Sequence, residues 1–364
     1  MNQKLDAEPL MDDQQIAHHL SELTQIPGLS GREYPLVQYL QDRWSAAADL
    51  ERVSPLGSLH VMVEGEGAAP RPSIMFSAHL DAIGLMVTGI EDGFIRVASV
   101  GGVDARVLPG QEVVVHGKRD LPGVIHLPPP PFLPSGARKN SVDVDHLLVN
   151  VPVGNEKLPQ LVEVGDGITF KSQPRILGEQ FLTGPSLDNR ASIAAMTCLL
   201  DTLVSTPTGW DVWVAATSQE EENMAGARTS AHAIAPDLAV VVDVTFASAP
   251  GAPDHKSFAF DGGITLGWGP TVHPVLYRRF ASLAADAEIP VTREPLPARS
   301  GTDADVLQIS AAGVPTMLLS IPIRYMHTPV EMVHIQSIKN TALLAHHFLE
   351  DTGKAYLKTI IQDG

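Results

Sequence analysis

Apolar residues recur every three or four positions in two segments near the start of the chain, residues 14–25 and 33–47. This spacing places the apolar side chains on one face of a helix, so both segments are predicted to be amphipathic helices. The five residues between them, Pro27-Gly28-Leu29-Ser30-Gly31, are typical of a turn.

From Ser73 onward, short apolar runs rich in β-branched residues alternate with helical patterns, among them residues 191–204 and 277–287. Strands that alternate with helices are typical of a largely parallel sheet with helices on both faces. The sequence therefore predicts a doubly wound α/β domain whose strands include residues 74–76, 212–216, 238–242 and 316–321.

Residues 84–180 have a different pattern, with strand-like segments and almost no helical periodicity. Asp92-Gly93 is a hairpin signal between two of these segments. The prolines at 128–131 and the following Pro134-Ser135-Gly136 predict a loop. We therefore predict an α/β domain formed by residues 1–83 and 181–364 and interrupted by an all-β insert of residues 84–180, whose strand-like segments are 85–90, 94–97, 112–115 and 123–125.

Composition narrows the class of protein. With 364 residues, of which 44% are hydrophobic and 18% charged, the chain can form two folded domains and is neither disordered nor fibrous. The 25 basic and 42 acidic residues give a net charge of −17, which disfavours nucleic acid and anionic membranes as partners. No apolar run is long enough for a membrane span, the first residues lack a secretory signal, and Cys198 is the single cysteine. These features favour a soluble protein of the cytoplasm.

Polar side chains collect where the predicted strands end. In an open α/β sheet, functional groups gather beyond the carboxyl ends of the strands. Each position has an ordinary alternative, since glutamates often begin a solvated helix and an aspartate before a helix is often its N-cap. All these residues nevertheless stand at equivalent positions relative to the predicted strands and helices, which indicates one joint site. They are His79 and Asp81 after 74–76, Asp188 before 191–204, Glu220 and Glu221 after 212–216, Asp243 after 238–242, and His327 after 316–321.

Imidazoles and carboxylates are the ligands that borderline divalent cations prefer. Five such residues give two ions three ligands each if one aspartate bridges them, and two ions activate a shared water molecule. Of the adjacent Glu220 and Glu221, one can bind metal while the other accepts the proton of the water, because consecutive side chains point in different directions. Asp81 is placed to accept the second ring hydrogen of His79 and fix its tautomer.

Six segments carry a resemblance to a known family. In chain order they are Ala78–Gly84 (Ala-His-Leu-Asp-Ala-Ile-Gly), Leu187–Arg190, Gln219–Glu221, Asp243–Thr245, Ser300–Ala304 and Arg324–Glu331. Together they resemble the tetrahedral-type dinuclear metallo-aminopeptidases, which are metallopeptidase family 42 of clan MH, also known as glutamyl aminopeptidases and sometimes labelled cellulases. The resemblance extends from Ile26 to Glu331.

The resemblance implies a role for each site residue and a pair of zinc or cobalt ions per subunit, with manganese as a third candidate. Asp188 would bridge the two metals, and the peptide bond that follows it would be cis. Glu220 would be the general base and acid, and Asp81 would orient His79. The remaining metal ligands would be His79 and Asp243 on one ion and Glu221 and His327 on the other, and the pocket for the substrate would include Gly301, Thr302 and Asp303.

The resemblance also implies an assembly. The insert would be a PDZ-like or barrel-like dimerisation domain, and dimers would form a dodecamer that encloses a chamber for short peptides. The chain departs from the family pattern within the insert, where residues 127–134 contain no histidine and Asn150 stands where an aspartate is common. It departs again at Glu222-Asn223-Met224, beside the expected pocket.

Other functions stay open at this point. The chain could be an amide deacylase of the related desuccinylase type, or an assembly protein without catalytic activity. Glycoside hydrolysis fits poorly, because the paired carboxylates it needs are committed to metal here. Among peptide substrates we expect a neutral or hydrophobic first residue, although Arg293, Arg299 or Arg324 could favour an acidic one.

Overall fold

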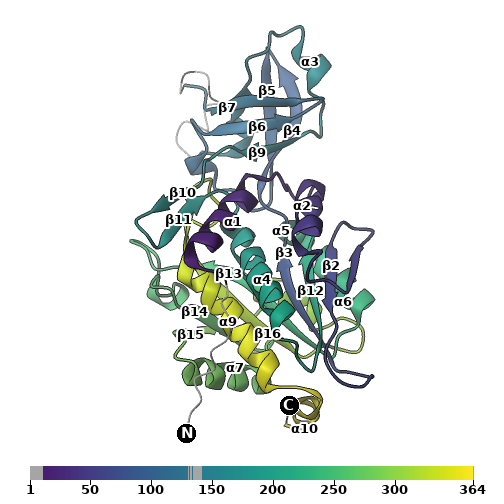
Figure 1. Ribbon diagram of the computed structural model, residues 1–364. Helices are drawn as coiled ribbons and strands as arrows, with labels where there is room; N and C mark the ends of the chain where they lie inside the picture. The colour runs from purple at the N-terminus through teal and green to yellow at the C-terminus, as the bar shows by residue number, and fades with distance from the viewer. Residues whose placement is uncertain (1–10, 130, 132, 134–141, 364) are drawn as a thin grey trace.

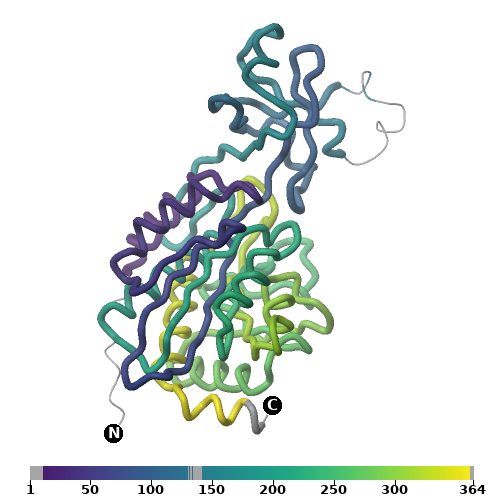
Figure 2. Tube along the Cα trace, turned by 90° about the vertical axis from the view of Figure 1, so that its right-hand side faces the viewer, coloured from purple at the N-terminus to yellow at the C-terminus, as the bar shows by residue number. Residues whose placement is uncertain are grey.

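The protein has two parts, a large α/β body and a small β-barrel at one end of it (Figures 1 and 2). The computed structural model describes residues 11–129, 131, 133 and 142–363. Pro130 and residues 134–136 of the predicted proline-rich loop lie outside the described residues.

The two predicted amphipathic helices are α1 (Asp13–Gln25) and α2 (Tyr34–Trp44). Asp12 caps α1, because its carboxylate accepts a hydrogen bond of 2.8 Å from the backbone of Gln15, whose side chain bonds back to Asp12. The apolar stripe of α1 packs against α4 (Leu187–Ser205), a helix that is buried along most of its length.

A mixed eleven-stranded sheet forms the centre of the large body. Its core is parallel and consists of β12 (Asp211–Thr217), β3 (Ser73–His79), β13 (Leu238–Phe246) and β16 (Thr316–Arg324), in that order. Shorter strands extend both edges. They are β1 (Leu50–Val53), β2 (Leu59–Val63), β10 (Arg175–Leu177), β11 (Phe181–Gly184), β14 (Ile264–Trp268), β15 (Val291–Pro295) and β17 (Glu331–His334).

Helices cover both faces of this sheet, as parallel strands buried on both sides require. On one face, α1, α4 and α9 (Ile335–Asp351) pack against one another (Figure 1). The strands also contact α6 (Ala225–Ile234), α7 (Pro274–Asp286) and the short α8 (Ala304–Leu307), and the chain ends in α10 (Lys354–Asp363). The helices in the described part of the chain include none with the length and apolar character that a membrane crossing needs.

The barrel is closed, with strand order β4-β5-β8-β7-β6-β9, and it has a hydrophobic core of its own. It also contains the short α3 (Leu158–Leu161). The doubly wound α/β fold with an all-β barrel confirms the predicted fold class. The strands are β4 (Gly84–Glu91), β5 (Phe94–Val100), β6 (Glu112–His116), β7 (Asp120–His126), β8 (Leu148–Asn150) and β9 (Gly167–Phe170).

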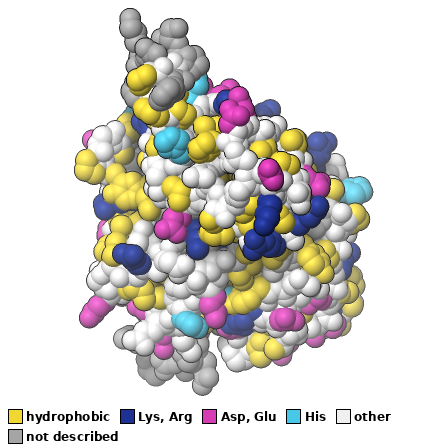
Figure 3. Space-filling model, turned by 90° about the horizontal axis from the view of Figure 1, so that it is seen from above, with side chains coloured by type: hydrophobic (Ala, Val, Ile, Leu, Met, Phe, Trp, Pro, Cys, Tyr) yellow, Lys and Arg dark blue, Asp and Glu magenta, His cyan; other side chains and the backbone are white. Residues whose placement is uncertain are grey.

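The chain returns from the barrel to the large sheet between β9 and β10, that is, between Phe170 and Arg175. We propose that residues 1–83 and 181–364 form one domain and residues 84–180 the other. Seen from the barrel end, basic, acidic and apolar side chains are interspersed, so the acidic excess of the sequence forms no single field on this face (Figure 3).

Candidate metal centre

The parallel strands bring the predicted site residues to one edge of the sheet. His79 is the last residue of β3, and it lies beside Thr217, the last residue of the neighbouring β12. Directly after β12 comes the short α5 (Glu220–Asn223), which carries Glu220 and Glu221. Asp243 lies in β13 next to β3, Asp188 in the first turn of α4, and His327 in the loop that follows β16.

Asp188 lies between two pairs of potential ligands. Its Oδ1 is 3.1 Å from Nε2 of His79, which in turn is 3.6 Å from Oδ1 of Asp243. Its Oδ2 is 3.4 Å from Nε2 of His327, which is 3.5 Å from Oε2 of Glu221. One carboxylate therefore presents a separate oxygen to each pair, which is the arrangement of a bridging ligand.

The donor set fits two divalent cations. Ligand atoms about 2.1 Å from a tetrahedral ion lie about 3.4 Å from one another, and the spacings around Asp188 are close to this value. Oε1 of Glu221 is buried and has no hydrogen-bond partner among the described residues. A buried carboxylate oxygen without a partner is costly unless a cation or proton compensates it.

Protonation in the metal-free chain reflects the same crowding of carboxylates. Burial lowers the pKa of His79, but the carboxylates of Asp188 and Asp243 outweigh this effect and raise the pKa well above its usual range. Burial raises the pKa of Glu220 to about 10; His79 opposes the shift and Asp243 adds to it. In the metal-free chain, bound protons therefore reduce the repulsion among these carboxylates, and bound metal ions would do the same.

Asp81 contacts His79 in a different way from the one expected. Nδ1 of His79 is 3.0 Å from the backbone carbonyl oxygen of Asp81 and 3.5 Å from its carboxylate. The carboxylate instead accepts hydrogen bonds from the backbone N–H groups of Glu220, at 2.9 Å, and Glu221, at 3.1 Å. Asp81 therefore orients His79 through its main chain and fixes the start of α5 through its side chain.

Glu331 is a buried part of the site to which the sequence assigned no role. Its Oε1 accepts a hydrogen bond of 2.8 Å from the backbone N–H of His327, and its Oε2 one of 3.0 Å from that of Asp188. Burial raises the pKa of Glu331 to about 8. The only signal was its place at the end of the segment Arg324–Glu331. The peptide bond between Asp188 and Asn189 is cis, which confirms the expectation from the resemblance.

A cavity of about 510 Å³ opens onto these residues. Gly301 and Thr302 line it, as expected, and so do Glu222, Phe246 and Glu294. No lysine or arginine is among the described residues that line this cavity.

Asp303 was expected beside Gly301 and Thr302 in the substrate pocket, but it is not among the described residues that line the cavity. The residue is 1% exposed, and its Oδ2 accepts hydrogen bonds of 2.6 Å from Thr217 and 3.0 Å from Ser77. Burial raises the pKa of Asp303 to about 7. Its carboxyl group thus ties the ends of β12 and β3 together.

The arginines that could have favoured an acidic substrate are not among the described residues that line the cavity. Arg293 packs over the rings of Trp268 and Tyr277. Arg324 donates a hydrogen bond of 2.8 Å to the carbonyl oxygen of Ser248, and Arg299 is not among the lining residues.

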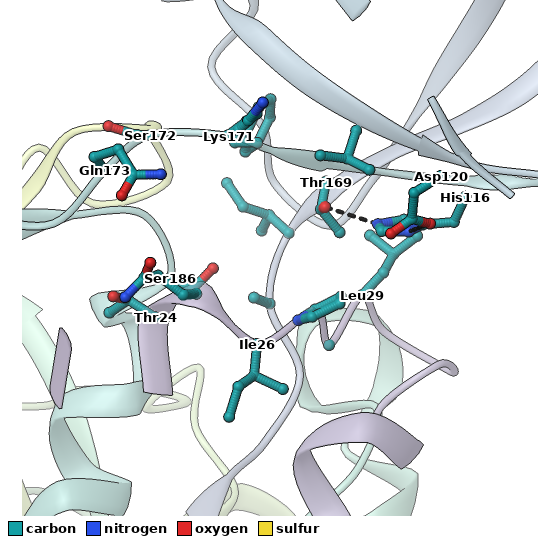
Figure 4. A pocket seen from close by; sticks show the side chains of 17 residues that line it. Thr24, Ile26, Leu29, His116, Asp120, Thr169, Lys171, Ser172, Gln173 and Ser186 are labelled. Atoms are coloured by element: carbon teal, nitrogen blue, oxygen red, sulfur yellow. Dashed lines mark hydrogen bonds and ion pairs between the residues drawn. The ribbon is translucent and has the colours of Figure 1, made fainter. Parts of the chain in front are cut away.

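A second cavity, of about 240 Å³, lies where the loop after α1 meets the barrel (Figure 4). Ile26 and Leu29 contribute from the loop, and His116 and Asp120 from the barrel. The ring nitrogens of His116 are 2.8 Å from Asp120 and 2.8 Å from Thr169. These polar groups are engaged with one another, so this cavity does not offer a second set of converging free ligands.

Comparison with known proteins agrees with this geometry. Residues 57–344 match the family described as M42 glutamyl aminopeptidase. The chain belongs to this family. An M42 aminopeptidase is a metal-dependent hydrolase of peptide bonds, so this chain is an enzyme of the aminopeptidase class.

Individual relatives cover nearly the whole chain. The lysyl aminopeptidase of Pyrococcus furiosus is 34% identical over 340 residues, which are 91% of this chain and 96% of the relative. An aminopeptidase structure from the archaeon Desulfurococcus kamchatkensis has a TM-score of 0.88 at 30% identity and covers 96% of this chain and 98% of its own. The TET1 peptidase of Pyrococcus horikoshii, which can assemble into a tetrahedron or a large octahedral shell, has a TM-score of 0.80 at 29% identity, with 93% of this chain and 100% of the other covered.

Proposed function

We propose that this M42 aminopeptidase removes N-terminal residues from short peptides with two metal ions bound around Asp188. The observation that carries the proposal is the division of the Asp188 carboxylate between His79 at 3.1 Å and His327 at 3.4 Å. His79 and Asp243 would hold one ion, and Glu221 and His327 the other. Zinc and cobalt suit these imidazole and carboxylate ligands, and manganese is a third candidate.

When bound, two such ions lower the pKa of a shared water molecule and polarise the scissile carbonyl group. The five ligands would hold the ions, and Glu331 fixes the backbone of two of these ligands, Asp188 and His327.

Glu220 is the proposed general base. Its Oε2 is 3.9 Å from Nε2 of His79, close to the ligands but outside the five-residue set. A carboxylate in this position can take the proton of the attacking water and deliver it to the leaving amine. Its pKa of about 10 is that of the metal-free cluster, and two cations beside it would lower the pKa, so that the carboxylate could accept the proton.

The cavity favours a basic first residue over the neutral one that the sequence led us to expect. Glu294 lines it and accepts hydrogen bonds of 2.7 Å from Thr245 and 2.5 Å from Thr265. Hydroxyl groups do not neutralise a carboxylate, and no lysine or arginine is among the described lining residues. A lysyl or arginyl side chain would supply the missing positive charge, and the Pyrococcus furiosus relative is named a lysyl aminopeptidase.

The proposal includes an assembly and a location. A dodecamer built from dimers, with the barrel as the dimerisation domain, is supported by the tetrahedral assembly of the TET1 peptidase. The cytoplasm is supported by the single cysteine, Cys198, which is buried and forms no disulfide.

A chelation experiment with matched substrates tests the activity. Activity on lysyl and leucyl p-nitroanilides should disappear with a chelator and return with cobalt or zinc. The same compounds with an acetylated or succinylated amino group should not be cleaved. Preferential cleavage of the acyl group from the blocked compounds would establish the deacylase instead, and no turnover of any of these compounds after metal is restored would contradict the proposed activity.

A further inference from the structure

Three potential metal ligands lie together on α9, far along the chain from the Asp188 site. His346, His347 and Glu350 each offer one ligand atom, and these atoms lie within 4.8 Å of one another. Oε2 of Glu350 is 3.5 Å from Nδ1 of His346 and 3.5 Å from Nδ1 of His347. These distances are again close to the value of about 3.4 Å expected between two ligand atoms of one tetrahedral ion.

The hydrogen bonds of His346 leave one ring nitrogen free to bind a cation. The hydroxyl of Thr206 donates its only hydrogen to the carbonyl oxygen of Thr202, at 2.7 Å. Oγ1 of Thr206 therefore accepts the hydrogen of Nε2 of His346, 2.8 Å away. In the neutral ring, Nδ1 then carries a lone pair, and it faces the carboxylate of Glu350.

Nδ1 of His346 and the carboxylate of Glu350 are both hydrogen-bond acceptors, so their approach is unfavourable unless a cation or a proton lies between them. Nδ1 of His346 is buried and has no hydrogen-bond partner among the described residues, and the residue is only 1% exposed. A metal ion satisfies both acceptors, and the bond from Nε2 to Thr206 holds the ring in the tautomer that metal binding needs.

The surroundings also favour a cation. The three residues lie in the last turns of α9, where unpaired carbonyl groups make the helix end negative. The side chains of His347 and Glu350 are 18% and 32% exposed, so an ion can reach them from solvent. In Figure 1, α9 runs away from the barrel towards α10 and the C-terminus.

The same sequence spacing on α1 provides an internal comparison. His18, His19 and Glu22 repeat the pattern His-His-x-x-Glu. There, the second histidine, His19, which corresponds to His347, has both ring nitrogens engaged, with Tyr39 at 3.2 Å and Thr197 at 3.0 Å. The spacing alone thus does not create a set of free ligands, and α9 differs because Nδ1 of both His346 and His347 lies 3.5 Å from Glu350.

We propose that His346, His347 and Glu350 bind one divalent transition-metal cation of the zinc class, in addition to the ions at Asp188. The three side chains supply one ligand atom each, and water completes the coordination at the exposed side. Borderline ions such as zinc, cobalt or nickel match two imidazoles and a carboxylate better than calcium or magnesium.

Equilibrium dialysis of the metal-free full-length chain against zinc tests the proposal. His347→Ala and Glu350→Gln should each bind one equivalent per chain less than the wild type. The matched control His18→Ala, in the corresponding pattern on α1, should bind as much as the wild type. Aminopeptidase activity at saturating metal should be unchanged in all three variants, since none of these residues contacts the Asp188 site.

The measurement is repeated in an Asp188→Asn background so that it does not depend on the catalytic metals. The difference of one equivalent should persist there even if the proposed activity fails. Equal zinc binding by the wild type, His347→Ala and Glu350→Gln would overturn the site. If the alanine variant does not fold, Glu350→Gln decides the question, because glutamine keeps the shape of the side chain and the melting temperature reports its fold.

Discussion

Gly102 lies against the imidazole of His327, so the segment that leaves β5 touches the proposed metal centre directly. A Cβ atom added to Gly102 would lie 2.7 Å from Nδ1 and 2.9 Å from Cε1 of His327. Gly102 also lines the cavity of about 510 Å³ that opens onto the proposed metal centre. The barrel segment therefore contributes to the position of a metal ligand.

Gly102→Ala should reduce kcat/KM by about 10²-fold, because the ring of His327 must move away from Asp188 and Glu221. Gly154→Ala is the matched control in the same insert, since a Cβ there meets nothing within 4 Å. Steady-state kinetics with metal content measured in parallel check the prediction. Equal activity of the two variants would mean that His327 tolerates the displacement.

Glu220→Gln should lower kcat by about 10² to 10⁴-fold while the chain keeps its metal, because glutamine cannot accept the proton of the water. Glu222→Gln is the control: Glu222 also lines the cavity, but its carboxylate accepts a hydrogen bond of 2.8 Å from the backbone of Gly101. We expect the control to stay within a few fold of wild type. A Glu220→Gln variant that retained most of its turnover would contradict the proposed mechanism.

Glu294→Gln should lower kcat/KM for lysyl substrates by about tenfold or more and change that for leucyl substrates little. The variant keeps the size of the side chain near Thr245 and Thr265 but removes its negative charge. Loss of one ion pair worth about 1.4 kcal/mol gives a tenfold change. Kinetics over a panel of aminoacyl substrates measure this ratio, and an equal loss for both substrates would assign Glu294 a structural role only.

Stability should fall as the pH is lowered from about 6.5 to about 4, in part because of His60. Burial, with a contribution from Arg52, lowers the pKa of His60 to about 4. Arg52 donates a hydrogen bond of 3.2 Å to Nδ1, and Nε2 is 2.7 Å from the hydroxyl of Ser230, so the folded chain holds the neutral ring. Above pH 6.5 the folded and unfolded states are both neutral at this residue. Between 6.5 and 4 only the unfolded state takes up the proton, which costs about 3 kcal/mol of stability by pH 4.

Urea unfolding at several pH values checks this prediction. His60→Gln should weaken the dependence of the unfolding free energy on pH in this window, whereas His18→Gln, at an exposed position on α1, should leave it unchanged. Identical slopes for the two variants would show that His60 does not contribute.

Much of the fold and the grouping of the site residues could be predicted from periodicity. The run at 74–76 lies within β3, which extends to His79, and the run at 238–242 lies within β13, which includes Asp243. Parallel strands place their carboxyl ends at one edge, so residues that follow such runs meet without further information. Hydrogen-bond partners are a different matter. Asp81 bonds through its carbonyl oxygen and through its carboxylate, and Asp303 bonds to Ser77 and Thr217, because the packing of distant segments decides which donor each carboxylate reaches.

The resemblance of six segments implied a hydrolase, whereas the order of apolar runs and strand-end acids by itself predicted an α/β fold with an all-β insert and one joint site. The sequence did not determine which of two segments with the same spacing of histidines and glutamate provides free ligands. His-His-x-x-Glu occurs on α1 and on α9, and both segments form helices. Helical periodicity fixes only which side chains share a face. Neighbouring elements decide the rest. Tyr39 and Thr197 engage both nitrogens of His19, the second histidine of the α1 pattern, whereas on α9 Thr206 engages only Nε2 of His346, and Nδ1 of both histidines faces Glu350. Those partners come from distant parts of the chain, so only the tertiary structure brings them together.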